Sequence, residues 1–274
     1  STFAPNEKIL GIPIEKVGFP QPACDKINSE VKKATKGMIF NLVNPSDLST
    51  DTTILLLNAI YFKSDWKKKF SIGSDSKIPK IKNFTLINGT KIHVNMLESN
   101  NRNLPYSEND KFQVVSIPYT HDQYDFVIIL PKNKTQEGYN DLKKLTFQRL
   151  NDDLLKQMKI QKVNVRIPKF SFETKTLLKE IFISLGMEKA FSNQSDCSDP
   201  AVKYYVDSII QKAKIVLDEN GTEAAAATAM TVNCLSIEID PTPSVNADHV
   251  FAYLLRNSKT GVILFEGFVN NPSE

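Results

Sequence analysis

The chain has 274 residues, of which 41% are hydrophobic, and a formal net charge of +3. This length and composition suffice for a buried core, and we expect a single domain over residues 1–274. The weakly basic net charge gives no reason to expect nucleic acid as a partner. The sequence contains no run of eighteen apolar residues, so we expect no membrane span. The first residues also lack the basic and apolar regions of a signal peptide.

The first predicted elements are a helix and a buried strand. Over residues 24–37, apolar side chains recur at helical spacing and Gly37 follows as a stop. Residues 52–62 form a short, partly β-branched apolar run, which predicts a strand buried on both faces, and its polar Asn58 then needs a buried partner. Residues 80–131 alternate between strand patterns and turns, including an Asn-Gly turn, and predict antiparallel hairpins.

The second half of the chain continues the mixture of helices and strands. We predict a helix over residues 139–158, a strand over 162–172 and a helix over 174–187 that stops at Gly186. The C-terminal residues predict two strands joined by a hairpin at 257–261. Because strands outnumber helices and do not alternate with them regularly, the fold class is α+β with large antiparallel sheets.

Motifs for catalysis or metal binding are missing from the sequence. There is no glycine-rich phosphate loop, no nucleophile elbow and no H-E-x-x-H helix, so we expect no catalytic residue, metal or cofactor, and no enzyme. The histidines are interpreted as surface or satisfied structural residues rather than metal ligands. They are His93, His121 and His249. The cysteines are interpreted as free thiols, or as one bridge plus one free thiol. They are Cys24, Cys197 and Cys234.

Two surface features indicate possible extracellular chemistry. Four sites match the N-glycosylation acceptor pattern, which favours an extracellular protein, with the cytoplasm as the alternative. These sites are Asn83, Asn88, Asn133 and Asn193. A cluster of lysines predicts either a solvated face or a patch for a sulfated polysaccharide. The run at its centre is Lys67, Lys68 and Lys69, between Trp66 and Phe70, which we interpret as a core pair.

The stretch from Glu219 to Thr228 has an unusual pattern of small residues. Its four alanines favour a helix by propensity, but no apolar stripe follows. If the stretch is a strand, the side chains on one face are all small. They belong to Thr222, Ala224, Ala226 and Thr228. The other face carries Glu223, Ala225, Ala227 and Ala229. Such a strand can enter an existing sheet without separating packed side chains, and Gly221 supplies a hinge.

These residues resemble the hinge of inhibitory serpins, the serine protease inhibitor family, whose signature resembles E-x-G-T-E-A-A-A-A-T. Further matches are INSEVKKATKGMI, LNAIYFKSDWKKKF, IPKF and ADHVFAYLLRNSKTGVILFEGFVNNP. The resemblance implies a serpin fold with three β-sheets, surrounding helices and an exposed reactive-centre loop over about residues 219–246. The family normally has about a hundred further residues ahead of the first helix, so N-terminal helices are expected to be absent from this chain, together with any signal peptide.

The resemblance also implies a mechanism and a set of site residues. A serine protease attacks the exposed loop, an acyl-enzyme forms, and the cleaved loop inserts into the central sheet and distorts the protease. The reactive bond falls between Leu235 and Ser236, with Asn233 or Cys234 as alternatives if the register shifts. The resemblance places the sheet-opening region at Asn58, Trp66, Lys169 and Gln211. Gln211 replaces a usual histidine, and we expect it to keep a hydrogen bond to Asn58, while Glu219 can pair with Lys169.

Leu235 suits the apolar primary pocket of chymotrypsin-like or elastase-like proteases and argues against trypsin-like targets. We therefore expect a monomeric inhibitor that forms a covalent complex with its target protease. The alternatives are a non-inhibitory serpin that acts as carrier, storage protein or chaperone, and an inhibitor of papain-like cysteine proteases.

Overall fold

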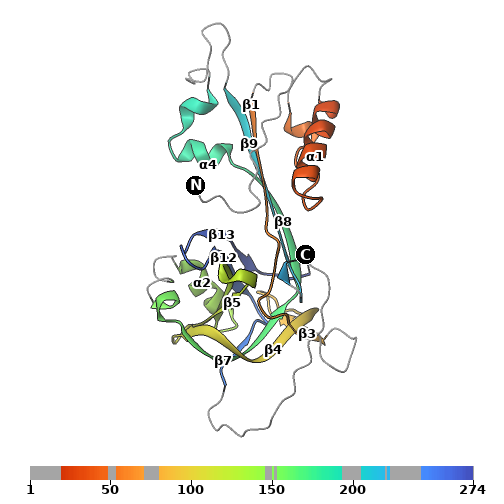
Figure 1. The fold of residues 1–274 in the computed structure, drawn as a ribbon. Helices are drawn as coiled ribbons and strands as arrows, with labels where there is room; N and C mark the ends of the chain where they lie inside the picture. Colours follow the sequence, from red (N-terminus) through yellow and green to blue (C-terminus); the bar gives the residue numbers. More distant parts are fainter. Residues whose placement is uncertain are drawn as a thin grey trace. The chain divides into compact units, whose positions relative to one another are not determined.

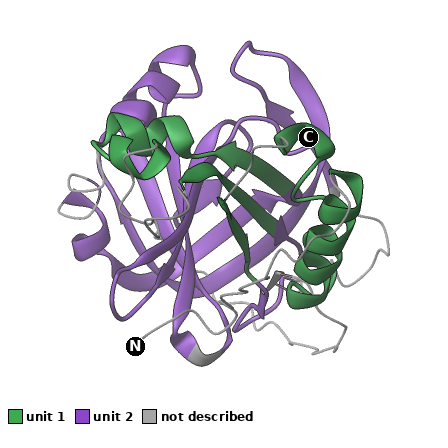
Figure 2. Cartoon of the chain, turned by 90° about the horizontal axis from the view of Figure 1, so that it is seen from above, with its two compact units in different colours: residues 1–62, 172–215 green, residues 63–171, 216–274 purple. Residues whose placement is uncertain are grey.

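In the computed structural model, the structure describes residues 20–48, 54–70, 80–145, 150, 153–192, 205–219, 221–222 and 242–273. These residues form two compact units, shown in green and purple in Figure 2. The first unit comprises residues 1–62 and 172–215, and the second comprises residues 63–171 and 216–274. The assignment of residues 1–274 to a single domain stays a prediction.

The described strands form three sheets (Figure 1). The largest has eight strands, seven of them in the order β11-β7-β4-β5-β6-β12-β13, with β3 paired to β4. A three-stranded sheet has the order β1-β9-β8, and β2 pairs with β10. The strands are β1 (Ile54–Tyr61), β2 (Ser64–Asp65), β3 (Lys80–Thr85), β4 (Lys91–Glu108), β5 (Phe112–Pro118), β6 (Tyr124–Pro131), β7 (Lys159–Pro168), β8 (Phe170–Leu177), β9 (Val206–Leu217), β10 (Gly221–Thr222), β11 (Ser244–Asn246), β12 (Phe251–Asn257) and β13 (Ile263–Val269). The α-helices are α1 (Gln21–Ala34), α2 (Gln136–Lys144) and α4 (Lys179–Ser184), with 3-10 turns at Pro45–Asp47, Thr120–Asp122, Leu155–Gln157 and Glu188–Phe191.

Unit 1 is built on the packing of α1 against β1 and β9. The helix begins at Gln21, before the predicted start at Cys24, and ends at Ala34, ahead of the predicted stop. Gly37 follows this end with a φ of +80°, and its amide hydrogen-bonds to the Lys32 carbonyl at 2.7 Å. The helix and the strands bury one shared apolar cluster. It consists of Cys24, Ile27, Val31, Ile39, Leu42, Val43, Tyr61 and Ile210.

The strand predicted to be buried on both faces is buried on only one. In β1, Leu55, Leu57 and Ala59 pack against the α1 cluster, whereas Leu56 on the opposite face is 46% exposed. Leu55, Leu57 and Ala59 are themselves only partly buried, and among the described residues the α1 cluster packs on their face alone. The prediction that Asn58 is buried is therefore wrong, because its residue is exposed on the uncovered face.

Unit 2 contains the antiparallel hairpins that the sequence predicts. The β3–β4 turn has Gly89 at a φ of +82°, and the Asn88 side chain accepts a hydrogen bond from the Thr90 amide at 3.0 Å. The β12–β13 turn has Gly261 at a φ of +74°. One buried apolar cluster of unit 2 combines side chains of the large sheet, of α2 and of residues 150–155. Its buried members are Phe112, Val114, Val127, Ile129, Leu142, Leu150, Leu154, Leu155 and Leu254.

Several predicted helix and strand bounds require correction. The helix predicted over 139–158 begins earlier, at Gln136, and α2 ends at Lys144, because Leu145 turns to a ψ of 104°. Leu150 and Asp153, later in the predicted range, are again helical. The helix predicted over 174–187 is shortened to α4, since strand β8 continues to Leu177 and the β-branched Thr174 and Thr176 suit the strand. None of the described helices is long and apolar enough to cross a membrane.

Candidate functional site

The start of the predicted hinge lies against residues 64–70, which we call the hinge anchor. Strand β10 pairs with β2 in antiparallel register, with Gly221 opposite Asp65 and Thr222 opposite Ser64. The chain leaving β9 is therefore already paired as an extended strand before the alanine-rich stretch. This position suits a segment that continues into a loop directly from a sheet.

Two further hydrogen bonds join the hinge anchor to the residues just before β10. The Trp66 indole Nε1 donates to the Asp218 carbonyl at 2.9 Å, and the Phe70 amide donates to the Glu219 carbonyl at 3.1 Å. Trp66 is 2% exposed and its ring stacks on that of Tyr119 at 4.4 Å. Together these contacts fix the backbone at Asp218 and Glu219, just before β10.

Trp66 and Phe70 form the core pair that their spacing predicts. Their ring centroids lie 5.7 Å apart at an interplanar angle of 76°, an edge-to-face arrangement, and both residues are buried. The hinge anchor is also hydrogen-bonded to strand β5 of the large sheet, because the Lys67 amide donates to the Pro118 carbonyl at 3.0 Å. The hinge anchor therefore contacts the large sheet through Lys67 and the start of the hinge through Trp66 and Phe70.

The ion pair predicted between Lys169 and Glu219 is present, with Lys169 Nζ 2.5 Å from Glu219 Oε2. Burial on its own would raise the pKa of Glu219, but the hydrogen bond from Lys169, a backbone hydrogen bond and the positive charge of Lys169 together outweigh it and hold that pKa below its ordinary value of 4.5. The Glu219 side chain is 23% exposed and that of Lys169 is 37% exposed, so the pair is only partly shielded from water. The pair adds a side-chain contact to the backbone bonds at Glu219.

Asn58 and Gln211 lie in unit 1, where β1 and β9 pair in parallel register and place the two residues opposite each other. The predicted hydrogen bond is present, with Asn58 Nδ2 donating to Gln211 Oε1 at 3.3 Å. This bond is exposed, in contrast to the buried partner expected for Asn58. The role of the two residues in sheet opening stays a prediction.

Other residues predicted from the sequence lie outside the described residues. This applies to Glu223, Ala224, Ala225, Ala226, Ala227, Thr228, Leu235, Ser236, Asn193, Cys197 and Cys234. The other three glycosylation candidates, Asn83, Asn88 and Asn133, are exposed, as modification requires. In the lysine run, Lys67 and Lys68 are exposed, but Lys67 Nζ lies 2.6 Å from Asp122 Oδ2, which reduces the free positive charge.

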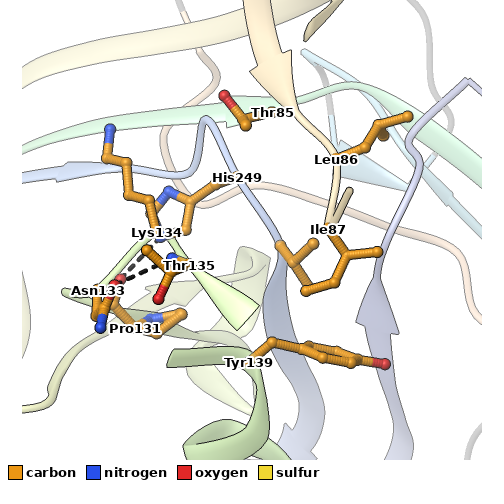
Figure 3. A pocket seen from close by; sticks show the side chains of 10 residues that line it. Thr85, Leu86, Ile87, Pro131, Asn133, Lys134, Thr135, Tyr139 and His249 are labelled. Atoms are coloured by element: carbon orange, nitrogen blue, oxygen red, sulfur yellow. Dashed lines mark hydrogen bonds between the residues drawn. The ribbon is translucent and has the colours of Figure 1, made fainter. Parts of the chain in front are cut away.

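A pocket in unit 2 is lined by Tyr139, Asn133 and His249, among other residues (Figure 3). His249 is 4% exposed, and its Nδ1 lies 2.8 Å from Asp248 Oδ1 while its Nε2 lies 2.8 Å from the Pro131 carbonyl oxygen. Because both ring nitrogens are hydrogen-bonded, His249 is a satisfied structural histidine, as interpreted from the sequence. The pocket contains none of the hinge or sheet-opening residues.

Arg102, which lies beside the hinge anchor, is a residue that no pattern in the sequence indicates. Its guanidinium donates through Nη2 to the Lys68 carbonyl and lies over the Phe70 ring, 5.0 Å from the centroid. It is 3% exposed, which is unusual for an arginine. A single charged residue in an alternating strand pattern is ordinarily read as solvent-facing, so only the fold could reveal this position.

Comparison with known proteins places this arrangement in a family. The family model described as serpin (serine protease inhibitor) matches residues 6–272. The chain is 34% identical over 264 residues to an uncharacterized serpin-like protein of Thermococcus kodakarensis, covering 94% of this chain and 58% of that protein. It is 33% identical over 254 residues to Antichymotrypsin-2 of Bombyx mori, covering 89% of this chain and 64% of that protein.

Among solved structures, the native state of the thermophilic serpin Tengpin matches with a TM-score of 0.78 and 27% identity, covering 93% of this chain and 64% of that chain. The chain therefore belongs to the serpin family and has the α+β serpin fold. It spans about three fifths of the length of the curated relatives it matches.

Proposed function

We propose that this serpin inhibits chymotrypsin-like or elastase-like serine proteases as a suicide substrate. The protease serine attacks the carbonyl of Leu235, the bond to Ser236 breaks, and the new amino terminus leaves as the acyl-enzyme forms. The N-terminal part of the cleaved loop, from Glu219 onward, then enters the central sheet as a strand before water hydrolyses the ester. The nucleophile belongs to the protease, so the inhibitor contributes a conformational change.

The observation that carries the proposal is the anchored start of the hinge. Gly221 and Thr222 are already extended and paired with β2, and Glu219 is fixed by both Phe70 and Lys169. The residues that follow are small, so insertion would bury no bulky or charged inward side chain. A fixed start and a smooth continuation together favour a fast and directed insertion over release of the cleaved loop.

The target class follows from the side chain at the proposed reactive bond. Leu235 carries no positive charge and fits an apolar primary pocket. The name of the similar silkworm protein, Antichymotrypsin-2, agrees with a target of this kind. The alternative targets, papain-like cysteine proteases, also attack through an acyl intermediate and would be trapped by the same insertion.

We also propose an extracellular site of action, with glycosylation at one or more of Asn83, Asn88 and Asn133. Their exposure supports this assignment. A sulfated polysaccharide is proposed as an accessory ligand of the lysine run at Lys67, Lys68 and Lys69. Binding to a heparin column that weakens steeply between roughly 0.05 and 0.2 M salt would support it, whereas elution at the lowest salt would exclude it.

The test of the inhibitory function is incubation with chymotrypsin followed by a denaturing gel. A band at the summed mass of protease and inhibitor, less the peptide released from Ser236 onward, is the expected result, because the acyl bond survives denaturation. Leu235→Arg is the matched variant, and we expect it to lose the complex with chymotrypsin and to gain one with trypsin. Cleavage of the loop without any covalent band would contradict inhibition and favour the carrier, storage or chaperone alternative.

A further inference from the structure

Arg102 is a buried cation in the middle of strand β4. Its side chain contacts both ends of a short stretch of the hinge anchor, the Lys68 carbonyl through Nη2 and the Phe70 ring through its guanidinium face. Phe70 in turn donates its amide to the Glu219 carbonyl. One side chain thus connects the large sheet to the residue that holds the base of the loop.

A bulge in β4 directs this side chain. Between Ser99 and Arg102 the strand advances three residues while β7 advances two, from Val165 to Val163. Asn101 has a φ of +51°, in the left-handed region. The extra residue changes which face of the sheet Arg102 occupies, since side chains alternate along a strand. Such bulges re-aim side chains and are commonly found beside functional sites.

The guanidinium is incompletely satisfied where it lies. Its Nη1 is buried and has no hydrogen-bond partner among the described residues. Burial lowers the pKa of Arg102 to about 10, so the side chain remains charged at neutral pH. A buried unpaired donor costs stability, and an apolar side chain of similar length would avoid that cost.

We propose that Arg102 is a positioning residue for loop insertion. By contacting the Lys68 carbonyl and the Phe70 ring at once, its side chain fixes the Phe70 amide against the Glu219 carbonyl. Its contribution is geometric, and the charge it keeps buried serves the orientation of the hinge rather than the stability of the fold. This role rests on the inhibitory function proposed above. Without these two contacts, the backbone at Glu219 moves more freely and loop insertion slows. Hydrolysis of the acyl-enzyme then competes more effectively with insertion.

The test compares three variants of the chain. Arg102→Met keeps a long apolar side chain but removes the hydrogen bond and the charge, and Arg102→Lys keeps the charge without the planar guanidinium. Lys159→Met is the matched control, because Lys159 lies on neighbouring strand β7 with an exposed side chain. For each, we would measure thermal stability, hydrogen exchange of the Phe70 amide and the molar ratio of inhibitor needed to block one chymotrypsin.

We expect Arg102→Met to reduce protection of the Phe70 amide roughly three- to tenfold while the thermal midpoint stays the same or rises. The inhibitor-to-protease ratio should rise at least twofold, Arg102→Lys should lie in between, and Lys159→Met should match the parent. Unchanged Phe70 protection in Arg102→Met would overturn the proposal. So would a fall in the thermal midpoint in proportion to the loss of protection, since that would show a general structural role.

The two proposals fail in different ways. If the parent chain forms no covalent complex, the inhibitory function fails, while Phe70 exchange still reports whether Arg102 holds the anchor. If the parent inhibits and Arg102→Met leaves the inhibitor ratio unchanged, the positioning role fails and the inhibitory function stands.

Discussion

Replacement of Lys169 by methionine tests the ion pair at the base of the loop. The change keeps most of the aliphatic stem and removes the charge that lies 2.5 Å from Glu219. With side-chain exposures of 37% and 23%, the pair lies between a surface pair, worth up to about 1 kcal/mol, and a buried pair whose disruption costs about 3–5 kcal/mol. We therefore expect a loss of about 1–2 kcal/mol, which lowers the thermal midpoint by about 2–8 °C for a chain of this size.

The pH dependence of this effect has a definite sign. Because the pKa of Glu219 is held below its ordinary 4.5 in the folded chain, the folded state binds fewer protons there than the unfolded state. The stabilisation is fully present above pH 4.5 and is lost as the pH falls through the lowered pKa. The difference between the parent and Lys169→Met should thus be constant from pH 7 to pH 5 and shrink below pH 4.5.

The assay is thermal unfolding of both proteins across this pH range. Lys33→Met is the control, since Lys33 pairs with Glu30 on an exposed helix face with its own side chain 71% exposed, and we expect its midpoint to match the parent. An unchanged midpoint for Lys169→Met at neutral pH would refute a stabilising pair. A difference that persists undiminished well below pH 4.5 would refute its electrostatic origin.

Three further substitutions probe the hinge and the large sheet. Thr222→Arg should turn the inhibitor into a substrate, because insertion would bury the arginine at a cost of several kcal/mol, and an unchanged yield of covalent complex would refute this. Asp125→Ala should destabilise unit 2 by about 3–5 kcal/mol in denaturant unfolding, because the buried carboxylate accepts from Arg256 Nε and Nη2, both at 3.0 Å, and its loss leaves the guanidinium, whose side chain is 16% exposed, unpaired. Gly267→Ala should cost about 1–3 kcal/mol, since the added Cβ would lie 2.9 Å from the buried ring of Tyr253, and parental stability would show that the ring can shift.

The features that sequence predicts best are local ones. Gly37 ends the first helix and Gly89 and Gly261 shape two hairpins because each adopts a positive φ, which depends on that residue alone. The Asn58–Gln211 and Lys169–Glu219 contacts were available only through the resemblance to the family, since each pair is separated by at least fifty residues in sequence.

The features that sequence misses depend on neighbours. The apolar run at β1 predicts burial on both faces, but burial is decided by what packs on each face, and among the described residues only α1 and its cluster do so. Arg102 is missed for the opposite reason, because a charged residue ordinarily indicates exposure and a bulge places this one inside. Both errors concern tertiary packing, which periodicity does not contain.

The measurement that tests the inhibitory mechanism most directly is the intact mass of the products after reaction with chymotrypsin under denaturing conditions. The mechanism predicts two new species. One is the protease joined to the chain through Leu235, and the other is the released peptide that begins at Ser236. If the spectrum instead shows unmodified protease beside a cleaved inhibitor, or a cleavage site away from Leu235, the proposed trapping at this bond is contradicted.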